Sequence, residues 1–163
     1  MIRKVEMERF TETSSKPFDD VVAAIKAAIG HPNMAEFSKS TQAATSAAEL
    51  EAAIKPVLGK TGLMLFVEFD QGMIVRKGTE RHASRIIRLV IGNPLIMKEM
   101  AKHVPDAGSY APVTVLVDER ADGVHISYDR MASLLAPYGN PDALDVARYL
   151  DAKIEDLLQK AAG

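Results

Sequence analysis

The chain has 163 residues, of which 47% are hydrophobic and 26% are charged, and its formal net charge at pH 7 is -2. This length and composition are typical of a globular protein with one core, so we expect a single domain over residues 1–163. The charge excludes a general attraction to nucleic acid, and the lack of cysteine excludes disulfides, thiolate catalysis and cysteine-ligated metal sites.

The N-terminal part of the chain predicts one strand and one helix. Alternation of apolar residues indicates a strand over residues 5–13. Pro17 suits the first turn of a helix and Gly30 suits its end. Between them, apolar residues recur at helical spacing and predict a buried stripe: Phe18, Val21, Val22, Ile25 and Ile29.

A second helix signal follows. Residues 31–45 are polar and rich in alanine, and no element is assigned to them. Ser46 and Glu49 have the spacing of a capping box, in which each side chain satisfies a free backbone amide at the start of a helix. The helix is expected to continue toward Leu58, with a kink or an early end at Pro56.

The next segment, residues 62–69, is strongly apolar. It is apolar on both faces as far as Glu68, which predicts a central, well-covered strand. Residues 70–72 favour a turn, and residues 73–75 are expected to pair back as a short hairpin strand.

Three strands and one helix are predicted in the following stretch. A strand over residues 85–91 is stopped by Gly92-Asn93-Pro94, and a helix is expected over residues 95–104. Two further strands, at residues 111–117 and 124–128, are joined by a turn. The corner at Gly92-Asn93-Pro94 offers free amides that can hold a phosphate, but a structural corner is the favoured interpretation.

The C-terminal part predicts a short helix and a long one. Residues 131–138 form a short apolar segment that Gly139 ends, and Asn140 and Pro141 suit the start of the long helix. The apolar stripe of the long helix is Leu144, Ala147, Leu150, Ile154, Leu157 and Leu158. The order of elements indicates an α+β fold, a mainly antiparallel sheet with helices on one face and the C-terminal helix chief among them.

Four short motifs occur in this order: Phe69-Asp70-Gln71-Gly72, Ile91-Gly92-Asn93-Pro94, Ser109-Tyr110-Ala111-Pro112 and Ser127-Tyr128-Asp129. On these motifs, residues 62–163 resemble the domain-of-unknown-function family 302. The resemblance implies an α+β fold that forms homodimers, is related in outline to the TATA-box-binding-protein-like folds, and has no established reaction. Gln71 departs from the family, whose members typically carry histidine there, so the resemblance implies no acid–base or metal role for this turn.

Asp70 is the first candidate site residue, because it follows a strongly apolar strand. Apolar surroundings favour the protonated form of a carboxyl group, which would enable it to transfer protons. The alternative is that Asp70 only stabilises the turn through hydrogen bonds to the backbone.

Arg88, Tyr128 and Asp129 complete the candidate ligand site. Alternation places Tyr128 on the inward face of its strand and Asp129 on the other. Tyr128 is either a polar handle in a pocket or a core anchor, and Arg88 interrupts an apolar strand and should pair with a buried carboxylate. One hypothesis is that Asp70, Arg88 and Tyr128 share a polar pocket; the other is that each group finds its own partner.

Positive charge is concentrated between residues 75 and 89, in Arg76, Lys77, Arg81, Arg85 and Arg88. This cluster is either an anion-binding rim or an ordinary solvated face. The four histidines, His31, His82, His103 and His125, have no metal-ligand spacing, so no metal site and no cofactor are predicted.

The function that we expect is binding of a small molecule in a partly apolar pocket, between the sheet and the C-terminal helix of a homodimer. Four methionines favour an adaptable pocket: Met64, Met97, Met100 and Met131. One alternative is a cofactor-free enzyme that uses Asp70, Tyr128 or Asp129 for proton transfer. Another is a dimeric interaction protein without a small ligand.

The sequence also suggests a location. The N-terminus lacks the apolar run of a signal peptide, and no apolar stretch approaches the roughly 20 residues that span a bilayer. We therefore expect a cytoplasmic protein with no membrane partner.

Overall fold

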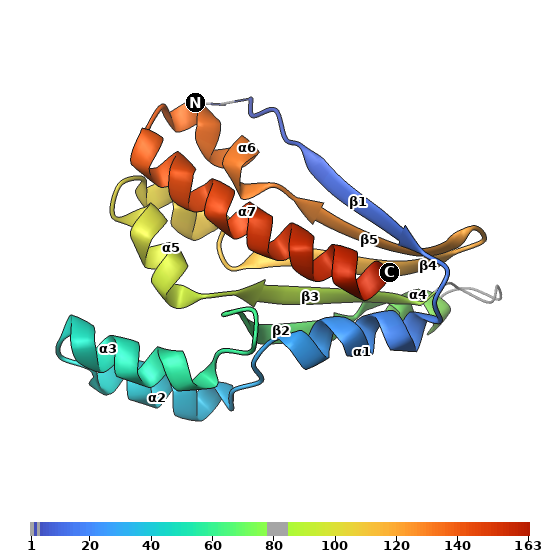
Figure 1. The fold of residues 1–163 in the computed structure, drawn as a ribbon, viewed down its shortest axis with the longest axis horizontal. Helices are drawn as coiled ribbons and strands as arrows, with labels where there is room; N and C mark the ends of the chain where they lie inside the picture. Colours follow the sequence, from blue (N-terminus) through green and yellow to red (C-terminus); the bar gives the residue numbers. More distant parts are fainter. Residues whose placement is uncertain (1, 3, 78–84) are drawn as a thin grey trace.

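The structure, a computed structural model, describes residues 2, 4–77 and 85–163. In this part of the chain, one sheet is formed by the strands β1 (Arg9–Ser14), β2 (Met64–Asp70), β3 (Ile86–Gly92), β4 (Val113–Arg120) and β5 (Gly123–Asp129). The α-helices are α1 (Phe18–Ala28), α2 (Met34–Ala43), α3 (Ala47–Ile54), α4 (Gln71–Lys77), α5 (Pro94–Ala101), α6 (Met131–Leu135) and α7 (Pro141–Ala162). Short 3₁₀ turns are η1 (Lys55–Val57), η2 (Pro105–Ser109) and η3 (Ala136–Tyr138). The predicted α+β fold is confirmed (Figure 1).

The sheet has the strand order β1-β5-β4-β3-β2, and all neighbouring strands are antiparallel. β1 precedes the other strands in the chain yet pairs with β5, so that Arg9 lies opposite Asp129. β2 forms the other edge of the sheet and has a register shift between Leu65 and Val67. The sheet therefore joins the N-terminal segment to the C-terminal half of the chain.

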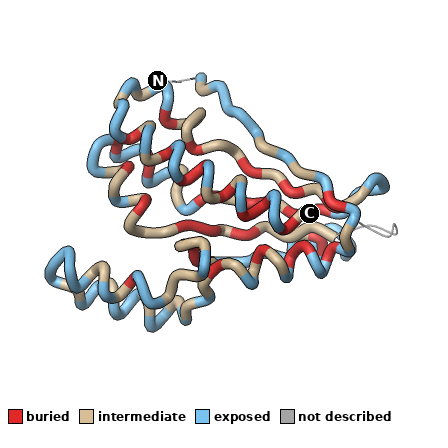
Figure 2. The backbone as a smooth tube through the Cα atoms, viewed as in Figure 1, coloured by how far each residue is buried: buried red, intermediate tan, exposed pale blue. Residues whose placement is uncertain are grey.

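Helices α1, α5 and α7 lie on one face of the sheet, and α2 and α3 form a helical pair beyond the end of α1 (Figure 1). The buried residues gather between the strands and the layer of α1, α5 and α7, whereas α2 and α3 are mostly exposed or half-buried (Figure 2). The long helix α7 buries most of its predicted stripe, including Leu150, Ile154 and Leu158. The prediction that the C-terminal helix belongs to the core is confirmed.

Alternation along the strands gives the sheet two different faces. The helix face, which packs against α1, α5 and α7, carries buried apolar residues: Leu89, Ile91, Val113, Val115, Val117, Val124 and Ile126. The opposite face, which we call the open face, consists of the intervening residues, among them Val67, Phe69, Ile86, Arg88, Val90, Thr114, Leu116, Asp118, His125, Ser127 and Asp129. Of these open-face residues, only Asp118 is buried.

The prediction of a central, covered strand over residues 62–69 was wrong. β2 is an edge strand, and Val67 and Phe69 are 38% and 46% exposed. The segment is apolar on both sides for two separate reasons. Its first residues enter the core, and Val67 and Phe69 contribute apolar surface to the open face.

The hairpin strand predicted at residues 73–75 was also wrong, because these residues belong to α4. The carboxylate of Asp70 accepts a hydrogen bond from the backbone amide of Met73 at 2.8 Å. This is the bond of a helix N-cap, which satisfies an amide that has no partner within the helix. The turn after β2 therefore opens a helix instead of returning the chain as a strand.

The other predicted elements are found with shifted ends. The first strand begins at Arg9, and the unassigned residues 31–45 contain α2, which Asn33 caps. Ser46 caps α3 as predicted, and α3 ends just before Pro56. The outline of the TATA-box-binding-protein-like folds stays a prediction.

Candidate functional site

Two carboxylates of the predicted site have partners at the surface. Asp70 caps α4 and lies 3.4 Å from the guanidinium of Arg76. Asp129 accepts two hydrogen bonds from the guanidinium of Arg9, at 2.6 and 3.0 Å. Of the two interpretations of Asp70, the geometry supports the one in which it stabilises the backbone of the turn. Ligand binding by Asp70 and Asp129 stays a prediction.

Tyr128 and Arg88 lie on opposite faces of the sheet. Tyr128 is on the helix face and is 1% exposed, whereas Arg88 is on the open face, where its Nη2 donates to Oγ1 of Thr114 at 3.1 Å. Asp70 stands at the end of the edge strand β2. The shared pocket of Asp70, Arg88 and Tyr128 is therefore not formed, and each group has its own surroundings.

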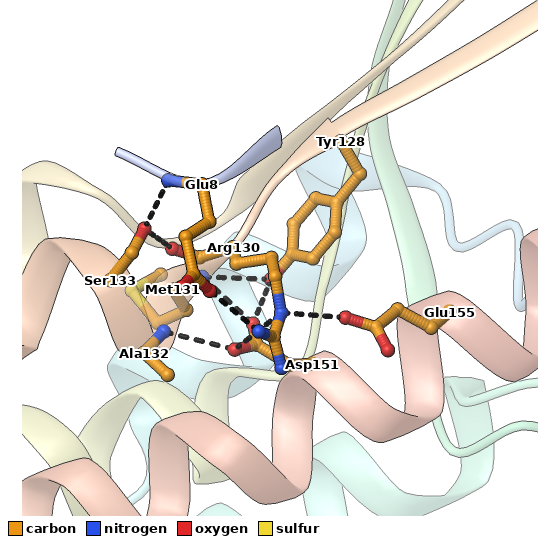
Figure 3. Close-up of polar contacts among 8 residues, drawn as sticks. All are labelled: Glu8, Tyr128, Arg130, Met131, Ala132, Ser133, Asp151 and Glu155. Carbon is orange, nitrogen blue, oxygen red and sulfur yellow. Dashed lines mark hydrogen bonds and ion pairs between the residues drawn. The ribbon is translucent and has the colours of Figure 1, made fainter. Parts of the chain in front are cut away.

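Tyr128 instead belongs to a buried polar cluster (Figure 3). Its hydroxyl donates a hydrogen bond to Oδ1 of Asp151 at 2.6 Å. The Asp151 carboxylate also accepts hydrogen bonds from the backbone amides of Met131, at 2.7 Å, and Ala132, at 3.0 Å. These are the first two residues of α6, whose own cap position, Arg130, makes no side-chain cap bond. Asp151 of α7 thus caps a neighbouring helix.

Arg130 and Ser133 extend this cluster to the segment before β1 (Figure 3). The guanidinium of Arg130 donates to Glu155 at 2.8 Å and to Glu8 at 2.6 Å, and it lies 3.9 Å from Asp151. The hydroxyl of Ser133 accepts a hydrogen bond from the backbone amide of Glu8 at 3.1 Å. The cluster therefore connects α6, α7 and the N-terminal segment.

The geometry of the cluster indicates a structural role. Both Asp151 and Tyr128 are 1% exposed, so a ligand in solvent has no access to them. Burial and the neighbouring Asp151 carboxylate raise the pKa of Tyr128, because an ionised phenol would place a second negative charge beside the first. The neutral phenol therefore donates a hydrogen bond to Asp151. Of the two interpretations of Tyr128, the geometry supports the core anchor over the polar handle in a pocket.

Sequence reasoning missed Asp151, although the sequence contains a signal for it. Asp151 follows Ala147 by four residues and precedes Ile154 by three, so it occupies a position of the apolar stripe of α7. A carboxylate at such a position must find donors inside the protein, because an unpaired buried charge is costly. Its donors lie in other elements, which the stripe alone does not identify.

A small apolar pocket lies where the bulge of β2, the corner between β3 and α5, and the start of β4 meet α7. It has a volume of about 80 Å³, and its lining includes Phe66, Gly92, Pro94, Met97, Pro112 and Leu150. We call it the corner pocket. Two motifs that carry the family resemblance, Gly92-Asn93-Pro94 and Ala111-Pro112, contribute to its wall.

Gly92 keeps the corner pocket open. A Cβ atom at this position would lie 3.1 Å from Cβ of Pro112 and 3.6 Å from Cε2 of Phe66, in the space between the two side chains. The polar atoms of Asn93 are already engaged, since its Oδ1 caps α5 and its Nδ2 donates to the carbonyl of Gly62 at 2.9 Å. The pocket therefore offers apolar packing rather than hydrogen bonds.

Among the described residues, no buried carboxylate pairs with Arg88 as the sequence predicted. Its guanidinium carbon lies 5.9 Å from the centre of the Phe69 ring, and Thr114 accepts one hydrogen bond from it. Its Nε is buried and has no hydrogen-bond partner among the described residues. The open face therefore contains a polar atom that the described part of the chain leaves unsatisfied.

Of the remaining basic residues of the 75–89 stretch, two form ion pairs and Lys77 is exposed. Arg76 pairs with Asp70, and the Arg85 guanidinium forms an ion pair with Asp19. Arg81 lies outside the described residues. The two ion pairs favour the solvated face over the anion-binding rim.

No group of three or more His, Cys, Asp or Glu residues within the described ranges could hold a metal ion. Among the helices of these ranges, none combines the length and the apolar character that crossing a membrane requires. The side chains of the proposed catalytic residues do not converge. Asp70 lies on the edge strand β2, Tyr128 on the helix face of the sheet and Asp129 on its open face. The enzymatic alternative stays a prediction.

Comparison with known proteins identifies a family and a similar fold. The family model described as domain of unknown function DUF302 matches residues 37–161, so the match begins before residue 62 and includes α3. No curated protein matches the chain. A solved structure, described as an uncharacterized conserved protein DUF302 from Bacillus stearothermophilus, is similar with a TM-score of 0.62 and 12% identity, over 94% of this chain and 94% of that chain. At this identity the similarity is one of fold.

Proposed function

The chain belongs to the DUF302 family, and for this member we propose binding of a small molecule whose apolar end fills the corner pocket. The observation that carries the proposal is the space that Gly92 leaves between Pro112 and Phe66. An apolar concavity between a sheet and a helix is a common form of ligand site. We also propose, as the sequence predicts, that residues 1–163 form a single domain and that the protein is cytoplasmic.

The size of the corner pocket limits the class of ligand. A volume of about 80 Å³ exceeds the roughly 30 Å³ share of one water, and it is smaller than the roughly 300–1,000 Å³ of a complete small-molecule site. The pocket suits one apolar group, such as a branched aliphatic group or a phenyl ring. The thioether of Met97 can adjust to different shapes of this group.

Benzene is a suitable probe, because it is apolar and forms no conventional hydrogen bonds. Titration with benzene should shift the NMR methyl signals of Met97, Val113 and Leu150, which line the pocket. Met97→Trp should fill the pocket and abolish these shifts. Met73→Trp, at a methionine of α4 that is 44% exposed, should leave them unchanged. Shifts that persist in Met97→Trp would contradict the proposal.

Native mass spectrometry of freshly purified protein provides a test with the natural ligand. The unmodified chain and Met73→Trp should carry the same co-purified small molecule, and Met97→Trp should lack it. The same co-purified mass in all three proteins would place the ligand outside the corner pocket.

We also propose that two copies of the chain associate through the open face. Val67 and Phe69 present apolar surface there, and the buried Nε of Arg88 has no partner within the described residues. A two-fold interface uses the same patch of both copies, so one contact would cover both apolar patches. Exposed apolar patches and sheet edges commonly gain such cover.

Light scattering between micromolar and millimolar concentration tests the dimer. The unmodified chain should have the mass of two copies over part of this range. Phe69→Asp should shift the mass toward one copy, whereas Tyr149→Asp, at a residue of α7 that is 56% exposed, should not. A mass of one copy at all concentrations would refute the homodimer.

A further inference from the structure

A larger groove lies between α1 and the C-terminal half of α7, and the loop before β2 closes one of its ends. It has a volume of about 460 Å³, which falls within the range of roughly 300–1,000 Å³ for small-molecule sites. We call it the α1–α7 groove. It shares no lining residue with the corner pocket, so a ligand in this groove is independent of the proposed function.

The floor of the groove is apolar and consists mainly of small side chains from the two helices. α1 contributes Ala24 and Ala28, and α7 contributes Leu157 and Ala161. Alanine leaves space that a longer side chain would occupy, so a trough runs along the contact between the two helices. An aliphatic chain lying in this trough would exchange water for apolar contacts on both sides.

The rim of the groove is mainly positive. Lys160 is compensated by Asp156, with Nζ and Oδ2 2.7 Å apart. Lys153 donates to the backbone carbonyl of Thr61 at 3.0 Å, and Lys60 is exposed. The Lys153 ammonium also lies 5.0 Å from the centre of the Tyr149 ring. No carboxylate of the described residues forms an ion pair with Lys60 or Lys153, so two positive charges at this rim lack a compensating negative charge.

The two uncompensated lysines lie at the same end of the groove. Lys60 and Thr61 are consecutive, and the Lys153 ammonium is bonded to Thr61. Thr61 in turn donates to the carbonyl of Ala28 at 3.0 Å, which fixes the loop against the end of α1. The groove therefore has a charged end, from which the apolar floor continues along α1 and α7 toward Ala161.

We propose that the α1–α7 groove binds an aliphatic carboxylate. The carboxylate lies between the ammonium groups of Lys60 and Lys153, and the hydrocarbon chain lies on Ala24, Ala28 and Leu157. The lysines determine the direction of the ligand, and burial of the chain provides most of the affinity. Such a ligand combines the two properties of the groove, which neither a purely apolar molecule nor a small inorganic anion does.

Four probes separate these contributions: sodium octanoate, sodium butyrate, 1-octanol and inorganic phosphate. Octanoate should bind saturably and shift the NMR amide signals of Thr61 and Leu157. Butyrate should bind at least about tenfold more weakly, since each buried methylene contributes about two- to fourfold in affinity. Octanol and phosphate should each bind more weakly than octanoate. Phosphate or octanol binding as tightly as octanoate would overturn the proposal.

Variants connect the binding to named residues. Lys60→Gln with Lys153→Gln should weaken octanoate binding about tenfold, whereas Lys55→Gln, which removes an ion pair with Glu51 away from the groove, should not change it. Lys60→Gln alone should weaken binding in a chain with an unchanged melting temperature. Ala24→Glu should abolish octanoate binding by placing a carboxylate in the apolar floor. Unchanged affinity in Lys60→Gln or in Ala24→Glu would refute the site.

Discussion

The two faces of the sheet differ in how they satisfy a polar side chain. On the helix face, the Tyr128 hydroxyl is bonded to Asp151, whose carboxylate also accepts two amides of α6. On the open face, the buried Nε of Arg88 has no partner in the described part of the chain. Both residues interrupt apolar strands, so the strands alone do not distinguish them. The difference is that α7 covers the helix face and brings a carboxylate with it.

Asp151→Ala should have the largest effect on stability, because it removes the acceptor of the buried cluster on the helix face. The buried donors of Tyr128, Met131 and Ala132 would lose their acceptor, and each unsatisfied group costs about 1–3 kcal/mol. We expect the free energy of unfolding in urea to fall by about 3–5 kcal/mol. Asp145→Ala, at an exposed residue of the same helix, should cost less than about 1 kcal/mol. Equal losses would contradict the role of the cluster.

Leu150→Ala compares the apolar parts of the two faces. Leu150 is 2% exposed, and removal of a buried leucine side chain costs about 2–5 kcal/mol, so the melting temperature should fall clearly. Leu116→Ala removes the same atoms from a half-buried position on the open face and should cost less than about 2 kcal/mol. An unchanged melting temperature in Leu150→Ala would mean that α7 does not support the core.

Arg88→Met tests the open face, where the Nε of Arg88 has no hydrogen-bond partner among the described residues. Methionine keeps much of the aliphatic length and removes the unpaired Nε, so the free energy of unfolding should change by less than about 1 kcal/mol or increase. Tyr128→Phe leaves Asp151 without one donor and should cost about 1–2 kcal/mol. A loss above about 2 kcal/mol in Arg88→Met, measured in urea, would show that Arg88 is already satisfied.

The smallest effect should be a loss of stability at alkaline pH that depends on Tyr128. The pKa of Tyr128 is raised in the folded protein above its ordinary value of 10.0 by burial and by Asp151. The folded state therefore retains a proton that the unfolded chain releases. This contribution to stability is complete well below pH 10 and is lost progressively as the pH rises through 10 and above. The loss at pH 10 is about 0.4 kcal/mol. Urea titrations at pH 8 and 10 should show a smaller decrease in Tyr128→Phe; identical decreases would contradict this assignment.

The sequence predicted the helix face more fully than the open face, for a physical reason. The apolar stripes of α1 and α7 repeat at helical spacing, so they predict both a helix and the side of it that is buried. Caps such as Ser46 and Asn140 act within one helical turn, so they can be recognised from neighbouring residues. Whether β2 is central or at an edge depends on whether another strand besides β3 pairs with it. The apolar segment of β2 fits both arrangements, so the sequence alone did not decide between them.

The sites were predicted less well than the fold, because they depend on contacts between distant segments. Alternation correctly placed Tyr128 inward, but its partner Asp151 comes from a helix 23 residues away in the chain. The corner pocket exists because Gly92 has no Cβ between Pro112 and Phe66, three residues that periodicity does not connect. The grouping of Lys60 with Lys153 likewise arises only when the loop before β2 contacts α7.

The pairing of β1 with β5 has a consequence for synthesis of the chain. Arg9 and its register partner Asp129 are 120 residues apart, so at about 5–20 residues per second β1 leaves the ribosome roughly 6–24 seconds before its partner. Ser14 waits longer still, since its hydroxyl donates to the carbonyl of Ala162. β1 is mostly polar, which reduces the aggregation of an unpaired strand during this interval. We therefore expect nascent chains to expose residues 9–14 to chaperones until α7 has been made.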